Sequence, residues 1–517
     1  MIIAEVSTRM KSVLRRCRGL RWHWLFRRLS ALTLAFVGWG GSVLSAPAPS
    51  APEPAPRLGI YHASPRLCLG DEPSQRDLRV LRLAFGLARS PAQRMSWPWY
   101  FRAQPTHLEP QGRVLLALDT VALWNLSPYR LLGVHPDFPI NEVRDRLALW
   151  REQVIVRVPS LVSASFLSIA QLEGPSPLQD PFLPSRLAQS RLLPFTAGLN
   201  GAAAGSACRH WPSGVILEPG TKRLAYRLRR GQAKGGGPFL LSAYRTRPAM
   251  WRDYLRGRLD ALLLEGDDFQ SALRRLRSEQ LGTWGELAGT QQLLLRPAPA
   301  LAGRLSIEQR QALSMSLPRG SLAQLDKQGR FAPVRAFLAP VLQTGQVEDT
   351  PLLRRDSLSA RRLWLKSESR PDQLRLAVLA HPFLERLAQR VREQWRKTLN
   401  LTLEVEVLTV DQFYRVIEQG EADMALEVAD LDNGSLQDLW LAALRAAGAS
   451  LDHGPPQWEA ALRNGLPYLP LIGNVHHVLL RRHPPPGLLQ RVCPGCRETA
   501  RPRRLAPKAV ERLNPQG

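Results

Sequence analysis

Apolar and polar residues alternate most regularly between residues 373 and 429, where the pattern predicts three strands joined by two helices. The strands are 373–380, 401–407 and 423–429, and the alternation of period two is clearest in the second. The first helix, 382–397, repeats its apolar residues at helical spacing. Strands that alternate with helices form a parallel or mixed sheet covered on both faces, so the expected fold class is α/β.

The second helix has clear signals at both ends. A capping box of Thr409 and Gln412 begins it, and Gly420 ends it. Helical spacing predicts a buried stripe made of Val410, Phe413, Tyr414 and Ile417. Sheets of this class bind ligands at the carboxyl ends of their strands. A ligand is therefore expected just after Val428, where the chain reads ADLDNG.

Other elements are predicted along the rest of the chain. Apolar runs at 113–124 and 152–162 predict strands, and 235–244 predicts a glycine turn that leads into a strand. Residues 251–266 predict a short helix followed by a strand. The capping box of Ser306 and Gln309 predicts a helix over 306–317.

The N-terminus is typical of an export signal. Eight basic residues and one acidic residue fall within 1–28, and an uncharged apolar run then ends in small residues, with cleavage expected after Ser45. The expected location is the periplasm, and an uncleaved membrane anchor is the alternative. Pro and Ala dominate 46–57, which predicts an extended linker.

The chain of 517 residues carries a net charge of +26. Removal of the leader, with its eight basic residues and one acidic residue, leaves +19. A basic surface favours anionic polymers, lipid headgroups or nucleic acid. Nucleic acid is not an expected partner, because the arginines are scattered and the predicted destination is outside the cytoplasm.

Four cysteines follow the leader. Cys68 and Cys208 are candidates for a disulfide in an oxidising compartment. Cys493 and Cys496 form CPGC in a basic tail, a spacing that suits a redox pair, half of a zinc site or a local disulfide. No second pair completes a zinc quartet, and His476 and His477 face opposite sides of a predicted strand, so no metal or other cofactor is expected.

Short motifs follow one another in a fixed order from residue 235 to residue 482. In chain order they are Gly236-Gly237-Pro238-Phe239, Gly257-Arg258-Leu259-Asp260, Arg310-Gln311-Ala312-Leu313-Ser314-Met315-Ser316, Gly420-Glu421-Ala422-Asp423-Met424-Ala425, and Ala429-Asp430-x-Asp432-Asn433. A strand over 466–482 then returns. This order resembles the peptide/nickel class of periplasmic solute-binding proteins, the extracellular subunits of ABC importers, over about half of the chain.

The resemblance implies a two-lobed periplasmic-binding-protein type II fold with a hinge. Lobe I would hold 58–300 and 468–482, lobe II would hold 301–467, and the basic tail 483–517 is expected to be disordered. This chain departs from the family at Glu427 and Val428, where an aromatic residue is usual. Only about 30 residues, 434–465, fill a segment that usually adds two or more helices, so a trimmed second lobe is expected.

The resemblance also implies a role for Asp430, whose counterpart in peptide-binding relatives binds the ligand's α-amino group. A carboxylate suits that task because a buried ammonium needs charged acceptors. Asp432, Asn433 and Trp440 are the other candidate ligand contacts. The alternatives are a turn-capping aspartate and a core tryptophan. Five more tryptophans are candidates for lining a cleft: Trp97, Trp99, Trp124, Trp211 and Trp284.

The functional hypothesis is an exported, monomeric binding protein that delivers a peptide-like solute to an ABC permease. No Gly-x-Ser-x-Gly, His-Glu-x-x-His or dinucleotide motif is present, and no enzyme activity is expected. The alternative is a binding-protein fold that has lost transport and acts as an envelope scaffold or at the membrane surface. Asp260 and Asp423, which lie in turns, are expected to be structural.

Overall fold

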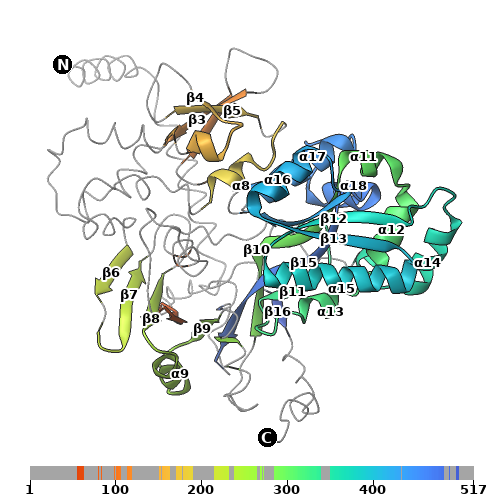
Figure 1. The fold of residues 1–517 in the computed structure, drawn as a ribbon. Helices are drawn as coiled ribbons and strands as arrows, with labels where there is room; N and C mark the ends of the chain where they lie inside the picture. Colours follow the sequence, from red (N-terminus) through yellow and green to blue (C-terminus); the bar gives the residue numbers. More distant parts are fainter. Residues whose placement is uncertain are drawn as a thin grey trace, which may run out of the picture. The chain divides into compact units, whose positions relative to one another are not determined.

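The chain divides into two units, Met1–Pro54 and Ala55–Gly517. The computed structural model (Figure 1) describes residues of the second unit only, namely 55–62, 80, 83, 98, 101–105, 113–118, 151–152, 154–163, 171–176, 179–189, 215–219, 221–231, 238–264, 268–269, 272, 284–338, 350–431, 434–481, 488 and 497–499. The predicted export signal and the four cysteines that follow it lie outside these residues.

Twelve strands of the described part form one mixed sheet. In spatial order ten of them are β13 (Thr402–Leu408), β12 (Gln373–Leu379), β14 (Met424–Asp430), β10 (Trp284–Pro297), β15 (Leu469–Leu480), β9 (Ala261–Leu264), β1 (Arg57–Tyr61), β8 (Phe239–Tyr244), β7 (Leu224–Arg230) and β6 (Val215–Pro219). The other two are β11 (Phe331–Pro333), which pairs with β15, and β16 (Arg497–Thr499), which pairs with β10. Because β16 lies in the basic tail, the expectation of a wholly disordered tail is wrong.

Each end of this sheet has its own hydrophobic core. The larger core surrounds β12, β14 and the first half of β15, and it includes Leu376, Leu426 and Leu471. The smaller core lies where β8, β9 and α9 (Arg247–Leu255) meet, and Leu479 near the end of β15 belongs to it. The strand β15 therefore runs from one core to the other, as expected for the returning strand.

Helices cover both faces of the sheet around the larger core, with α15 on one side of β12 and β13 and α16 on the other (Figure 1). The helical elements of this region are α11 (Pro299–Arg304), α12 (Ile307–Met315), α13 (Arg319–Ala323), η4 (Pro351–Leu353), α14 (Ser357–Lys366), α15 (Pro382–Leu399), α16 (Val410–Glu418), α17 (Ser435–Ala446) and α18 (Pro455–Gly465). The predicted capping boxes before α12 and α16 are both present. The segment 434–465, expected to be trimmed, holds the two helices α17 and α18.

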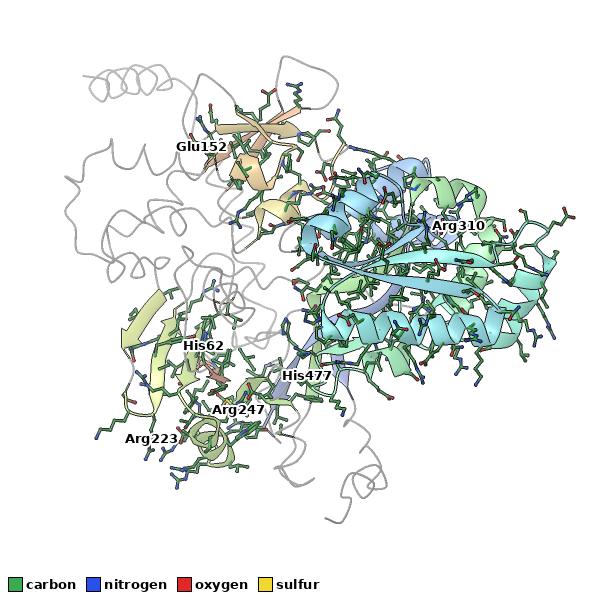
Figure 2. All side chains as sticks on the ribbon, in the orientation of Figure 1. His62, Glu152, Arg223, Arg247, Arg310 and His477 are labelled. Atoms are coloured by element: carbon green, nitrogen blue, oxygen red, sulfur yellow. The ribbon has the colours of Figure 1, made fainter. Side chains whose placement is uncertain are left out.

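Arg310 on α12 connects three helices. Its guanidinium, labelled in Figure 2, donates hydrogen bonds to three carbonyls at the ends of α11 and α18. The acceptors are Ala302, Leu305 and Gly465. Carbonyls at helix C-termini lack intrahelical partners and carry partial negative charge, so a guanidinium satisfies them. The arginine of the matched motif is thus a packing residue.

A second sheet of four strands has the order β2 (Phe101–Pro105), β3 (Arg113–Leu118), β5 (Gln171–Pro175) and β4 (Val162–Ser163). The strand predicted over 152–162 is wrong for most of its length, because residues 154–157 are helical. Val154 and Val158 are buried, whereas Val156 is 78% exposed. Residues four apart lie on the same face of a helix and also on the same face of a strand. The pair Val154 and Val158 therefore fits either structure.

The buried stripe predicted for α16 is only partly correct. Phe413 and Val416 are buried, while Val410 and Tyr414 are 59% and 58% exposed. The helix packs against a small cluster that includes Ala377 and Ala425, and this contact selects the buried face. Among the described residues, no helix is long and apolar enough to cross a membrane.

The pairing of β10 with β15 is irregular at one point, where a side chain accepts a hydrogen bond in place of the backbone. Their register shifts between Ala288 and Gln292. There the backbone N–H of Gln291 donates to Oδ1 of Asn474, 2.8 Å away. A Cβ atom at Gly289 would overlap the Asn474 amide. Glycine at this position therefore leaves the space in which Asn474 completes the ladder.

Gly289→Ala is expected to destabilise the protein by about 1–3 kcal/mol, because the added methyl displaces Asn474 and leaves the Gln291 N–H without its acceptor. The free energy of unfolding from denaturant titration measures this. Gly303→Ala on α11 is the control, since a Cβ added there would meet no atom within 4 Å apart from its chain neighbours and the backbone of its own helix. It should be neutral or stabilising by roughly 0.5–1 kcal/mol. Equal losses in the two variants would contradict the role of Asn474.

Candidate ligand-binding site

Asp430 ends β14 and is held from two sides. Its backbone N–H donates to Ser435 Oγ at 2.8 Å, and the Ser435 hydroxyl reaches back to the Asp430 carbonyl at 3.3 Å. The amide of Gln291 on β10 donates to the carboxylate at 3.2 Å. Asp430 is 7% exposed. Asp432 and Asn433 lie outside the described residues, and the ligand roles of all three remain predictions.

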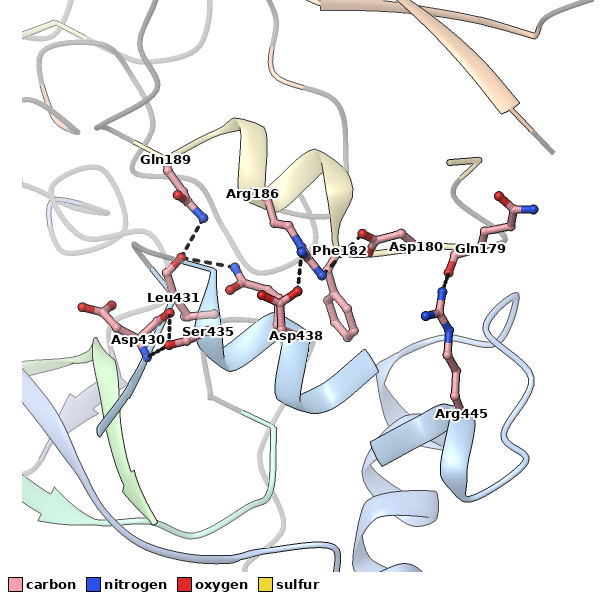
Figure 3. Close-up of polar contacts among 11 residues, drawn as sticks. Gln179, Asp180, Phe182, Arg186, Gln189, Asp430, Leu431, Ser435, Asp438 and Arg445 are labelled. Atoms are coloured by element: carbon pink, nitrogen blue, oxygen red, sulfur yellow. Dashed lines mark hydrogen bonds and ion pairs between the residues drawn. The ribbon is translucent and has the colours of Figure 1, made fainter. Parts of the chain in front are cut away.

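Leu431 connects the end of β14 to a distant part of the chain (Figure 3). Its N–H donates to the carbonyl of Thr290. Its carbonyl accepts from the amides of Gln189, at 2.9 Å, and Gln437, at 3.3 Å. Gln189 follows the short helix α8 (Leu183–Leu187), so the segment after β14 is fixed against residues more than 240 positions earlier. No pattern in the sequence around Gln189 indicates this contact.

A buried arginine lies beside this contact. Arg186 on α8 is 4% exposed and pairs with Asp438 Oδ1 on α17 at 2.6 Å and with Asp180 Oδ2 at 3.4 Å. Burial raises the pKa of Asp180, while the charge of Arg186 and the N–H of Phe182 oppose that rise. Arg186 Nε is buried without a hydrogen bond, and Arg186 Nη2 and Asp180 Oδ2 have only their long ion pair with each other. The cluster therefore holds polar atoms that a polar ligand could satisfy.

These charges line a cavity of about 690 Å³. This volume lies within the usual range for small-molecule sites. The charged lining residues are Arg113, Glu173, Asp180, Arg186, Asp438 and Arg445. Arg113 and Glu173 come from β3 and β5 of the four-stranded sheet, and Arg445 at the end of α17 donates to the carbonyl of Gln179. The cavity therefore presents both signs of charge to anything bound in it.

Trp440 lies in the larger core. It has no exposed surface, and its indole N–H donates to the hydroxyl of Tyr468, which in turn donates to the carbonyl of Phe337. Phe182, just before α8, packs against the rings of Trp440 and Trp458 at centroid distances of 5.6 and 5.2 Å. In this conformation Trp440 packs against the α8 segment and has no exposed surface, and its role as a ligand contact remains a prediction.

The remaining polar candidates are structural. Asp260 pairs with Arg57 and Arg481 and also accepts the backbone N–H of Arg57. Asp423 accepts the N–H of Arg375, and Glu427 pairs with Arg296 in place of the aromatic residue usual in the family. His477 stacks on Phe269 (Figure 2). Among the described residues no cluster of His, Cys, Asp or Glu could hold a metal ion. Trp97, Trp99, Trp124 and Trp211 lie outside the described residues, and nothing is described of the Trp284 side chain.

Arg186→Met is expected to destabilise the protein by about 3–5 kcal/mol at neutral pH, because it leaves the buried Asp180 without its cation. Removing Arg186 raises the pKa of Asp180 further. A carboxyl with a raised folded pKa favours folding below its unfolded pKa, about 3.9, and loses that contribution as the pH rises through the folded pKa. The loss should therefore be smaller near pH 4, as measured by urea unfolding at both values.

The double variant Arg186→Met with Asp180→Asn is the control for this effect. It removes the stranded charge and should recover part of the stability at neutral pH. A penalty that is the same at both pH values, and that the double variant does not relieve, would show that packing alone accounts for the loss.

No protein-family model matches the chain, and no curated protein matches it. Solved structures do match. One is the periplasmic murein tripeptide-binding protein MppA in its unliganded open form, with 13% identity and a TM-score of 0.51 over 83% of this chain and 93% of that one. Another is HbpA2 from Haemophilus parasuis, with 12% identity and a TM-score of 0.52 over 83% and 96%.

These similarities extend over nearly the whole length of both structures, and they confirm at the level of the fold what the order of the sequence motifs indicated. The N-terminal half, which lacks sharp motifs, is included in the match. The chain has the two-lobed α/β fold of the periplasmic solute-binding proteins.

Proposed function

We propose that this chain is an exported binding protein that captures a peptide-like solute between its lobes and passes it to an ABC permease. The observation that carries the proposal is the cavity of about 690 Å³ with arginines and carboxylates on its wall. A short peptide is a zwitterion, and it needs acceptors for its ammonium group and donors for its carboxylate. Both kinds of group are present at this cavity.

The end of β14 and the cavity are neighbours along α17. Ser435, which binds the backbone of Asp430, begins this helix, and Asp438, which lines the cavity, lies one turn later. One turn advances about 5 Å along the helix axis. Arg445 lies ten residues after Ser435, about 15 Å along the axis, so an extended peptide of about four or five residues could place its amino group at Asp430 and its carboxylate near Arg445. The ligand roles of Asp430, Asp432 and Asn433 belong to this proposal.

The fold and the N-terminal leader support the transport part of the proposal. One structural neighbour is described as binding a murein tripeptide, and a tripeptide of this kind suits a charged cavity. The basic leader and the small residues that end at Ser45 predict export. Closure of two lobes about a hinge is the usual mechanism of ligand capture in this fold.

The test is native mass spectrometry of the full chain, purified under gentle conditions, alongside Asp430→Ala and Arg445→Ala. A co-purified solute in the parent protein should be lost or weakened at least tenfold in each variant, because each removes one charged contact. Asp411→Asn is the matched control, since it removes an exposed acid from α16, away from the cavity. That variant should retain the solute.

A parent protein that carries no solute, and that gains no thermal stability from libraries of di- to pentapeptides, would contradict the proposal. The envelope-scaffold alternative would then be favoured. Loss of solute in Arg445→Ala but not in Asp430→Ala would keep the cavity as the site and remove Asp430 from it.

A further inference from the structure

A second cavity, of about 420 Å³, lies in a different part of the larger core region, where α13, β11 and η4 meet. Four arginines line it: Arg319, Arg335, Arg354 and Arg355. Thr350 and Ser321 are also on its wall, and none of the described lining residues is acidic. This cavity shares no lining residue with the one near Asp438.

Arg319 is a buried cation whose described hydrogen-bond partners are all neutral. It is 3% exposed. Its guanidinium donates to the carbonyl of Pro470 at 2.7 Å, to the carbonyl and hydroxyl of Ser314, both at 2.9 Å, and to the carbonyl of Leu353 at 3.1 Å. Burial lowers the pKa of Arg319 to about 9. A buried charge without a counter-charge is costly, so an anion in the cavity would stabilise it.

Three described acidic residues lie near Arg319 or its cavity, and each of them binds another group. Glu459 accepts the N–H groups of Phe337 and Leu338 at 2.9 and 2.7 Å. Asp356 accepts the N–H of Ser359 and caps α14. Asp326 pairs with Arg330. Each carboxylate is held by a specific donor, so none of the three supplies the counter-charge for Arg319.

We propose that this cavity binds a phosphate group carried on a small organic residue, as a phosphate monoester or diester. Arginine matches the oxygens of phosphate with two parallel donors and keeps its charge at all physiological pH values. Four arginines on the wall of one cavity suit a doubly charged group better than a single carboxylate. The cavity volume falls within the usual range for small-molecule sites, which leaves room for the organic residue.

The phosphate group belongs either to a lipid headgroup or to a free ester. The surface beside the cavity has features that suit a lipid headgroup. Arg355 precedes α14, on which Leu358 is 73% exposed and Leu365 is 56% exposed. Arg361 and Arg362 are exposed on the same helix. Residues at these spacings share one face, and exposed leucines with arginines are typical of helices that lie on anionic membranes.

The experiment uses the full chain and two probes. Glycerol 3-phosphate is titrated by calorimetry, and vesicles of phosphatidylcholine with or without phosphatidylglycerol are tested by flotation. Arg354→Ala and Arg355→Ala are the test variants, and both positions are exposed enough to leave the core intact. Whichever probe the parent binds, each variant should bind it roughly tenfold more weakly, which is the effect of losing one charge-assisted hydrogen bond. Arg415→Ala, on α16 and outside the cavity, is the matched control and should bind as the parent does.

Binding of glycerol 3-phosphate would assign a free ester, and binding of the anionic vesicles alone would assign a lipid headgroup. Failure of both probes would overturn the proposal, as would an equal loss in Arg415→Ala, which would show attraction to the basic chain as a whole. Neither outcome depends on the solute captured near Asp430.

One competitor comes from the chain itself, because Glu348 and Asp349 immediately precede Thr350 in the sequence. Their structure is outside the described residues. In the variant Glu348→Gln with Asp349→Asn, phosphate affinity should stay within about twofold of the parent. Phosphate binding that occurs only in this variant would show that these carboxylates occupy the cavity, and it would overturn the proposal.

Discussion

The pairing of β10 with β15 is the interaction on which the rest of the structure depends. These strands lie between the two ends of the sheet, where β10 pairs with β14 on one side and β15 pairs with β9 on the other. Buried backbone donors must keep their partners along the whole crossing. At the register shift after Ala288, the side chain of Asn474 provides the acceptor that the backbone no longer offers to Gln291. The sheet can therefore bend here without losing a hydrogen bond.

The same crossing fixes the candidate site. Gln291 lies opposite Asp430 in the pairing of β10 with β14, and its side chain holds the Asp430 carboxylate. Thr290, next to Gln291, accepts the N–H of Leu431. A change of backbone direction at the β10 irregularity would consequently move both groups that position the end of β14. Thr290 and Gln291 therefore tie the geometry at Asp430 to the backbone of β10.

Local signals explain how much the sequence could predict. The capping boxes at Ser306 and Thr409 and the helical spacing over 382–397 depend on neighbouring residues, and all three helices are present. The face that α16 buries depends instead on the strands that it packs against. Helical spacing alone therefore predicts a buried Tyr414, which is in fact exposed. The contacts at the candidate site, such as Arg186 with Asp438, join residues 252 positions apart. Neither residue lies in a motif, and only the folded chain brings them together.

Three arginines bind neighbouring elements of this fold, and they differ in their burial and in their counter-charges. Arg186 has two carboxylates. Arg310 has only helix-end carbonyls, yet it is half-buried, so water still screens its charge. Arg319 also has only neutral acceptors, but it lies deep in the core. Carbonyl dipoles are weaker counter-charges than an anion. Of the three, Arg319 therefore gains most from an anion in the cavity beside it.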